Sequence, residues 1–102
     1  MPGQGKVFTI TTPVSKPIRV LGDNAERGEF SIKNQGTTIA YYGYDQEVAT
    51  SGYHQGWPIS ASGGSIMNDR WQGEVWVICD AAVALTIEEI NGALRVITVA
   101  QR

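Results

Sequence analysis

The sequence predicts an all-β fold, either an antiparallel β-sandwich or a small jelly-roll-like barrel. Apolar and polar side chains alternate in many short runs, which is the period of a half-buried strand. Turn residues, glycine and asparagine above all, separate these runs at close spacing, and no stretch has convincing helical periodicity. The 102 residues suit one domain. We expect a mobile N-terminal tail over residues 1–5 and a single β-sandwich domain over residues 6–102.

Strand-like alternation occurs in seven runs, which are residues 6–12, 16–21, 29–34, 37–42, 73–80, 83–90 and 93–100. The alanines and glutamates of residues 80–90 would also suit a helix. Val83, Leu85 and Ile87 recur there at every second residue, however, which favours a strand. Residues 45–70 are less regular, and we expect loops and short edge strands in that segment.

Two turn sequences predict hairpins. Asn91-Gly92 supplies the positive φ angles of a type I′ turn and would join residues 83–90 to residues 93–100. Asn34-Gln35-Gly36 suits a slightly longer hairpin between residues 29–34 and 37–42.

The alternation also predicts one hydrophobic core. Its expected members are Phe30, Ile32, Ile39, Tyr41, Val75, Val77, Leu85 and Ile87. We also expect the large aromatic side chain of Trp76 to fill the core. Cys79 lies in an apolar run, and we expect it to be a small buried residue rather than a reactive thiol.

Charge and cysteine content argue against several classes of partner. The formal net charge is -2 and the basic residues are scattered singly, so we expect no nucleic-acid partner. One cysteine allows neither an intrachain disulfide nor a cysteine-based metal cluster. The start of the chain lacks the apolar segment of a signal peptide, and no run approaches the roughly 20 apolar residues of a membrane span. We therefore expect synthesis in the cytoplasm and no membrane partner.

The sequence offers little for catalysis. His54 is the one histidine, which excludes a multi-histidine metal site, and its neighbours are typical of an exposed loop tip. Ten carboxylates are present, but their spacing marks no pair that would face each other across a cleft. We expect no catalytic residues, no metal and no cofactor.

Seven of the nine aromatic residues fall between positions 41 and 76, which concentrates them in one part of the chain. In one interpretation they pack in the core or on a sheet face. In the other, some of them form an exposed patch that binds a protein or a sugar ring. The candidate residues for such a partner interface are Tyr42, Tyr44, Tyr53, His54 and Trp57, of which Tyr53 and Trp57 lie in turn sequences.

The run over residues 93–100 has apolar side chains on both faces. Leu94 and Val96 share one face, Ile97 and Val99 share the other, and Arg95 is its one charge. We expect this run to pair with a second copy or with a subunit of another protein, so the chain would work as a homo-oligomer or a bound array. Arg95, Ile97 and Val99 join the candidate interface on this ground. A central place inside the sandwich is the alternative.

Several turn and core motifs follow one another in a characteristic order. They are Ile32-Lys33-Asn34-Gln35-Gly36, Tyr42-Gly43-Tyr44-Asp45, Gly56-Trp57-Pro58-Ile59, Trp71-Gln72-Gly73-Glu74-Val75-Trp76-Val77-Ile78 and Leu85-Thr86-Ile87-Glu88-Glu89. Through these motifs, residues 30–89 resemble small β-sandwich virion proteins of tailed bacteriophages. The chain departs from that pattern after Glu89, where it adds the Asn91-Gly92 turn and residues 93–100.

The resemblance implies a non-enzymatic structural protein of the virion, which is assembled in the host cytoplasm. The expected role is a capsid decoration or cement protein that binds the assembled head and stabilises it, or a small head or tail accessory, with a capsid or other virion protein as partner. One alternative is a carbohydrate- or host-surface-binding module that uses Tyr53 and Trp57. A small β-sandwich or cupin-like enzyme is a third hypothesis, which the one histidine makes hard to sustain.

Overall fold

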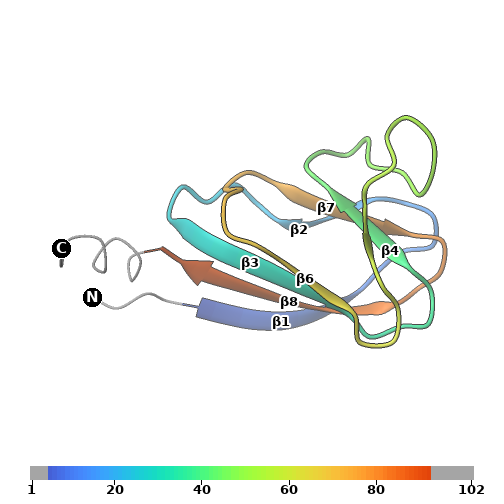
Figure 1. Ribbon diagram of the computed structural model, residues 1–102, viewed down its shortest axis with the longest axis horizontal. Helices are drawn as coiled ribbons and strands as arrows, with labels where there is room; N and C mark the ends of the chain where they lie inside the picture. Colours follow the sequence, from blue (N-terminus) through green and yellow to red (C-terminus); the bar gives the residue numbers. More distant parts are fainter. Residues whose placement is uncertain (1–4, 93–102) are drawn as a thin grey trace.

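The computed structural model describes residues 5–92, which form eight β-strands and no helix (Figure 1). The strands are β1 (Gly5–Thr11), β2 (Ile18–Leu21), β3 (Arg27–Asn34), β4 (Ala40–Gly43), β5 (Trp57–Ile59), β6 (Ser65–Asn68), β7 (Val75–Cys79) and β8 (Ala84–Asn91).

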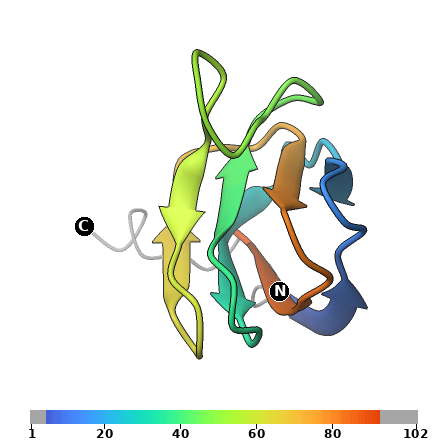
Figure 2. The same ribbon diagram turned by 90° about the vertical axis from the view of Figure 1, so that its right-hand side faces the viewer.

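The eight strands form two antiparallel four-stranded sheets that pack face to face, so the all-β sandwich is confirmed (Figure 2). Sheet A has the order β1-β8-β3-β6 and sheet B the order β2-β7-β4-β5. This is the strand order of a jelly roll. Among the described strands, β4 and β5 are the one consecutive pair that is hydrogen-bonded within a sheet, and every other connection crosses from one sheet to the other.

The strands lie where the alternation predicts them, with boundaries shifted by one to three residues. Two short strands, β5 and β6, form sheet edges within the irregular segment of residues 45–70, where short edge strands were expected. Gly5 belongs to β1 rather than to a tail, and the rest of the predicted tail and the run 93–100 lie outside the described residues.

The core between the sheets is built from the inward-facing side chains of the central strands. Six of the eight predicted core residues are fully buried there, namely Phe30, Ile32, Val75, Val77, Leu85 and Ile87. Cys79 is buried as predicted, and its thiol lies 3.4 Å from the carbonyl oxygen of Ile39.

The predicted inward face of β4 is wrong. Ile39 is 45% exposed and Tyr41 is half-buried, whereas Ala40 and Tyr42 face the core. Apolar residues occupy both faces of this strand, so alternation alone does not identify the inner one. The inner face is set by packing across the sandwich, where the ring of Tyr42 meets the ring of Phe30 edge-on at a centroid distance of 6.2 Å.

The prediction that Trp76 fills the core is also wrong. Val75 and Val77 on the same strand face inward, so the side chain of Trp76 leaves sheet B on the outer face, where it is half-buried. Its indole Nε1 donates a hydrogen bond of 3.0 Å to a carboxylate oxygen of Glu74.

The segment Asn34-Gln35-Gly36 joins the two sheets and is not a hairpin. β3 pairs with β8 and β6, while β4 pairs with β7 and β5, so the chain must change sheets here. The buried side chain of Asn34 makes this corner possible, because its amide donates to the carbonyls of Thr38 and Ile59 and its carbonyl accepts from the amide of Gly36. Gly36 itself lies so close to Val83 that a Cβ would clash with it.

Asn91 ends β8 and does not form the predicted type I′ turn. Such a turn requires a positive φ at Asn91. Within residues 5–92 the non-glycine residues with positive φ are Ser15 and Ser62. The Gly92 amide instead donates to the carbonyl of Glu26.

A buried ion pair closes the end of the sandwich where β3 begins. The Arg27 side chain is fully buried, and its Nε donates to the Glu89 carboxylate at 2.9 Å. Its remaining nitrogens donate to three backbone carbonyls, those of Gly22, Trp71 and Gly73, at 2.6–3.2 Å. The guanidinium therefore ties the β2–β3 and β6–β7 connections to sheet A.

Glu89 is held ionised by this arrangement. Burial by itself would raise the pKa of Glu89, but hydrogen bonds from Arg27, Asn24 and Lys6 outweigh it and leave the pKa below the ordinary value of 4.5. A lowered pKa in the folded state stabilises the fold above the unfolded-state value, and this stabilisation is lost as pH falls through the folded-state value.

We expect Glu89→Gln to flatten the acid side of the stability profile. Unfolding by urea, measured from pH 7 down to pH 2, should show that the wild-type chain loses stability below about pH 4.5 more steeply than the variant. Glu88→Gln, on the opposite face of the same strand, is the control and should keep the wild-type slope. Equal slopes for Glu89→Gln and wild type would contradict the assignment.

We expect Phe30→Ala to cost about 3–5 kcal/mol of unfolding free energy, because it removes a fully buried ring from the centre of the core. Trp76→Ala should cost distinctly less, since its ring is half-buried on the outer face. Urea titration of both variants tests this order, and an equal or larger loss for Trp76→Ala would place Trp76 in the core after all.

Candidate functional site

Aromatic side chains gather at one side of the sandwich, where β4 and β5 approach the segment that follows β6. Tyr42 and Trp57 are register partners on β4 and β5, so their side chains leave sheet B on the same face. That face packs on sheet A, since Ala40 and Ile59 on the same strands are fully buried. Trp57 is nevertheless 64% exposed. We call Tyr44, Trp57 and Trp71, with Tyr42 beneath them, the aromatic rim.

Tyr44 and Trp71 form the rigid part of the rim. Their rings are stacked at a centroid distance of 4.3 Å and an interplanar angle of 28°. The Trp71 indole donates to the carbonyl of Glu74 at 2.7 Å, and the Tyr44 hydroxyl accepts from the Asn68 amide at 3.2 Å. The two rings are therefore fixed before any partner arrives, although part of each remains exposed.

Tyr42 is the base of the rim rather than a contact residue. It is buried, and its ring meets the rings of both Phe30 and Tyr44 edge-on. Burial, followed by the neighbouring Tyr44 hydroxyl, raises the pKa of Tyr42 above 10.0 despite a hydrogen bond from Asn68. Its phenol is therefore neutral at physiological pH.

The loop between β4 and β5 projects beyond the sheets and is held by one buried side chain (Figure 2). Val48 packs against Gly43 and Gly56, where a Cβ on either glycine would come within 3 Å of its side chain. The amide of Ala49 donates to the carbonyl of His54 and that of Gly56 to Ala49, which closes the base of the loop.

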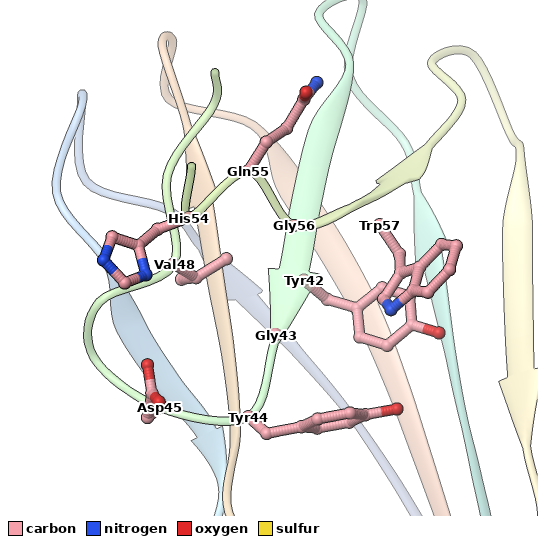
Figure 3. Close-up of a pocket in the computed structure, with 9 residues that line it drawn as sticks. All are labelled: Tyr42, Gly43, Tyr44, Asp45, Val48, His54, Gln55, Gly56 and Trp57. Carbon is pink, nitrogen blue, oxygen red and sulfur yellow. The ribbon is translucent and has the colours of Figure 1, made fainter. Parts of the chain in front are cut away.

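A shallow hollow of about 130 Å³ lies at the base of this loop (Figure 3). The rings of Tyr42, Tyr44 and Trp57 extend to one side of β4, whereas the side chains of Val48 and His54 lie on the other side. Tyr53, at the loop tip, is 98% exposed and contacts the His54 ring edge-on at 5.0 Å.

The structure brings together part of the predicted interface. Tyr44 and Trp57 share the rim, Tyr53 and His54 share the loop tip, and Tyr42 is buried between core and rim. The other predicted interface residues, Arg95, Ile97 and Val99, lie outside the described residues.

Sequence reasoning missed two features. Trp71 belongs to the rim through its stack with Tyr44, but 27 positions separate the two in sequence and no spacing links them. The outer face of sheet A carries a shallow groove of about 470 Å³, with Val7 and Met67, each 63% exposed, at its two edge strands. Val7 and Met67 are exposed because β1 and β6 lie at the edges of sheet A, and the order of strands in a sheet cannot be read from the sequence.

The arrangement suits stacking and hydrogen bonding. The exposed ring of Trp57 and the polar side chains of Asp45 and Gln55 line the same hollow. His54 lies 3.8 Å from Glu47, and both side chains are exposed.

Over residues 5–92, no three His, Cys, Asp or Glu side chains are grouped so as to hold a metal ion. The same residues include no helix that could cross a membrane.

We expect Val48→Ala to loosen the β4–β5 loop without unfolding the sandwich. The change removes two methyl groups, worth about 1–2 kcal/mol, from the contact with Gly43 and Gly56. Hydrogen exchange should speed up at the amides of Ala49 and Gly56, which close the loop, and not in β8. The exposed Val14→Ala is the control. Unchanged exchange at both amides would show that Val48 does not hold the loop.

Comparison with known proteins supports the fold. No model of a known protein family matches the chain, and no curated protein sequence does. A solved structure described as "Bacillus endospore appendages form a novel family of disulfide-linked pili" is similar, with a TM-score of 0.53 and 12% sequence identity. The match covers 87% of this chain and 85% of that one. At this identity the likeness is one of β-fold.

Proposed function

We propose that this chain is a non-enzymatic structural module that binds other proteins through the aromatic rim and the loop tip. We place it on the virion of a tailed phage, as a capsid decoration protein that binds the assembled head and stabilises it. The observation that carries the proposal is the rim itself, in which Trp57 is largely exposed and the stacked rings of Tyr44 and Trp71 are partly exposed and fixed in position.

Exposed aromatic side chains of this kind are what protein interfaces use. Trp and Tyr are enriched at interface centres and among the residues that dominate binding energy. Because the Tyr44–Trp71 stack is already ordered, these two side chains would lose little conformational entropy when a partner binds. Jelly rolls also occur in viral capsid and lectin domains, which supports the proposal by analogy of fold.

The pilus-like neighbour supports the coarser part of the proposal, a structural role for this kind of fold. Its description names disulfide-linked pili. Cys79 is the one cysteine of this chain and is buried in β7, so the association that we propose is non-covalent.

A carbohydrate- or host-surface-binding module is the second candidate. It is favoured by the largely exposed ring of Trp57 and by the polar side chains of Asp45, His54 and Gln55, which line the same hollow. Sugar rings stack on exposed aromatic faces, while their hydroxyls need polar partners of this kind at the ring edge.

The test asks whether the chain is present in phage particles and which substitutions weaken its binding to assembled heads. Mass spectrometry of purified phage particles should detect the chain in many copies, and purified chain should co-sediment with assembled heads. We expect Trp57→Ala and Tyr53→Ala each to weaken co-sedimentation about tenfold or more, which corresponds to about 1.4 kcal/mol. Val14→Ala, an exposed apolar residue away from the rim, should bind as wild type.

Absence from particles together with no binding to heads would overturn the phage proposal. Saturable binding of oligosaccharides, abolished by Trp57→Ala, would establish the second candidate in its place.

A further inference from the structure

Both edges of β8 are occupied along its length. β1 pairs with it from Gly5↔Ile90 to Thr11↔Ala84, and β3 pairs with it from Arg27↔Asn91 to Asn34↔Leu85. A strand that follows Gly92 therefore has no place beside β8. Residues 93–100 must therefore find another partner strand if their backbone groups are to be paired in a sheet.

β1 is the edge strand that fits this segment best. Of the four edge strands in the described sheets, β5 has three residues including Pro58, β2 and β6 have four each, and β1 has seven and no proline. A proline lacks the backbone donor that a new strand would need. An added strand of seven or eight residues is therefore matched in length only by β1 among these edges.

The side chains of β1 lack cover on the side away from β8. Phe8 and Ile10 face the core but remain half-buried, whereas Leu85 and Ile87 on the adjacent β8 are fully buried. On the other face of the strand, Val7 is largely exposed. A further strand next to β1 would place cross-strand neighbours beside all three side chains, and apolar residues on both of its faces, as the alternation of residues 93–100 supplies, would suit them.

The single charged side chain of β1 does not block pairing along most of the strand's edge. Lys6 is the one charged residue of the strand, and its ammonium lies 3.3 Å from the Glu89 carboxylate and 5.7 Å from the centre of the Phe8 ring. It is therefore turned toward the sheet. Val7–Thr11 carries no charge that would repel an incoming strand.

The chain's own C-terminal segment is poorly placed to fill this position. The outer edge of its own β1 lies two strand spacings from β8, about 10 Å, while the Gly92 amide is bonded to Glu26 on the opposite, β3 side. A segment that reversed direction there would also run parallel to β1, the less stable pairing. A second copy imposes neither constraint.

We infer that residues 93–100 of one copy add a strand to the outer edge of β1 in a second copy. The contact joins like subunits and does not involve the aromatic rim, so it goes beyond the proposed function. Main-chain hydrogen bonds would supply affinity, and the apolar side chains on both faces would supply register.

The test uses the full chain, whose monomer mass is 11.1 kDa, in size-exclusion chromatography with light scattering. Wild type should have at least twice that mass. Val7→Lys alters the acceptor edge and Ile97→Lys the donated segment, and each should weaken association at least tenfold. Met67→Lys is the matched control, because Met67 has the same exposure on the same face but lies on β6, the opposite edge.

Mixing the two defective variants gives the decisive result. Val7→Lys keeps an intact donor and Ile97→Lys keeps an intact acceptor, so the mixture should form a complex that neither variant forms alone. A monomeric wild type, a loss of association in Met67→Lys but not in Val7→Lys, or a mixture that stays monomeric would each overturn the inference. Trp57→Ala should self-associate as wild type, which separates this outcome from that of the proposed function.

Discussion

One whole end of the molecule depends on the hydrogen bonds of the buried Arg27 guanidinium. It donates to the Glu89 carboxylate and to three backbone carbonyls that belong to two different connections. A charge buried this fully is tolerated only when its hydrogen bonds are complete, and within residues 5–92 every buried side-chain nitrogen and oxygen has a partner. Two of those carbonyls belong to Trp71 and Gly73, so the same group that closes the sandwich also fixes the backbone beneath the aromatic rim. Stability and the shape of the candidate binding surface therefore share one interaction.

The parts of the fold that could be predicted from the sequence are those governed by neighbours along the chain. Period-two alternation located the central strands and six core residues, because successive side chains of a strand point alternately into the core and toward solvent. Alternation was insufficient for β4, where Ile39 and Ala40 both look apolar and only packing against Phe30 selects the inner face. Turn chemistry failed at Asn34 for a different reason. The same residues that suit a hairpin also suit a corner between sheets, and the choice depends on which strands lie alongside.

The sequence predicted that aromatic residues form the candidate site, but it identified only some of the individual residues. The concentration of aromatic residues between positions 41 and 76 was compatible with core packing and with an exposed patch, and Trp57 and Tyr53 are exposed as the second interpretation expects. Trp71 could not be included, since its place beside Tyr44 results from the way the two sheets pack face to face. In sheet A the rim lies toward the β6 edge and the inferred acceptor strand β1 forms the opposite edge. One copy could therefore contact a like subunit and a different protein at the same time, which is the arrangement that a surface lattice requires.

Val48 separates the outer part of the β4–β5 loop from the rest of the protein. Its side chain fills the space between Gly43 and Gly56, and the hydrogen bonds of Ala49 and Gly56 close the loop at that level. The four residues beyond this point, from Thr50 to Tyr53, extend into solvent and are half-exposed or exposed. Substitutions there touch neither the core nor the ion pair of Arg27. The loop tip is thus free to diverge in evolution, or to be replaced by another peptide in the laboratory, while the sandwich that carries it stays the same.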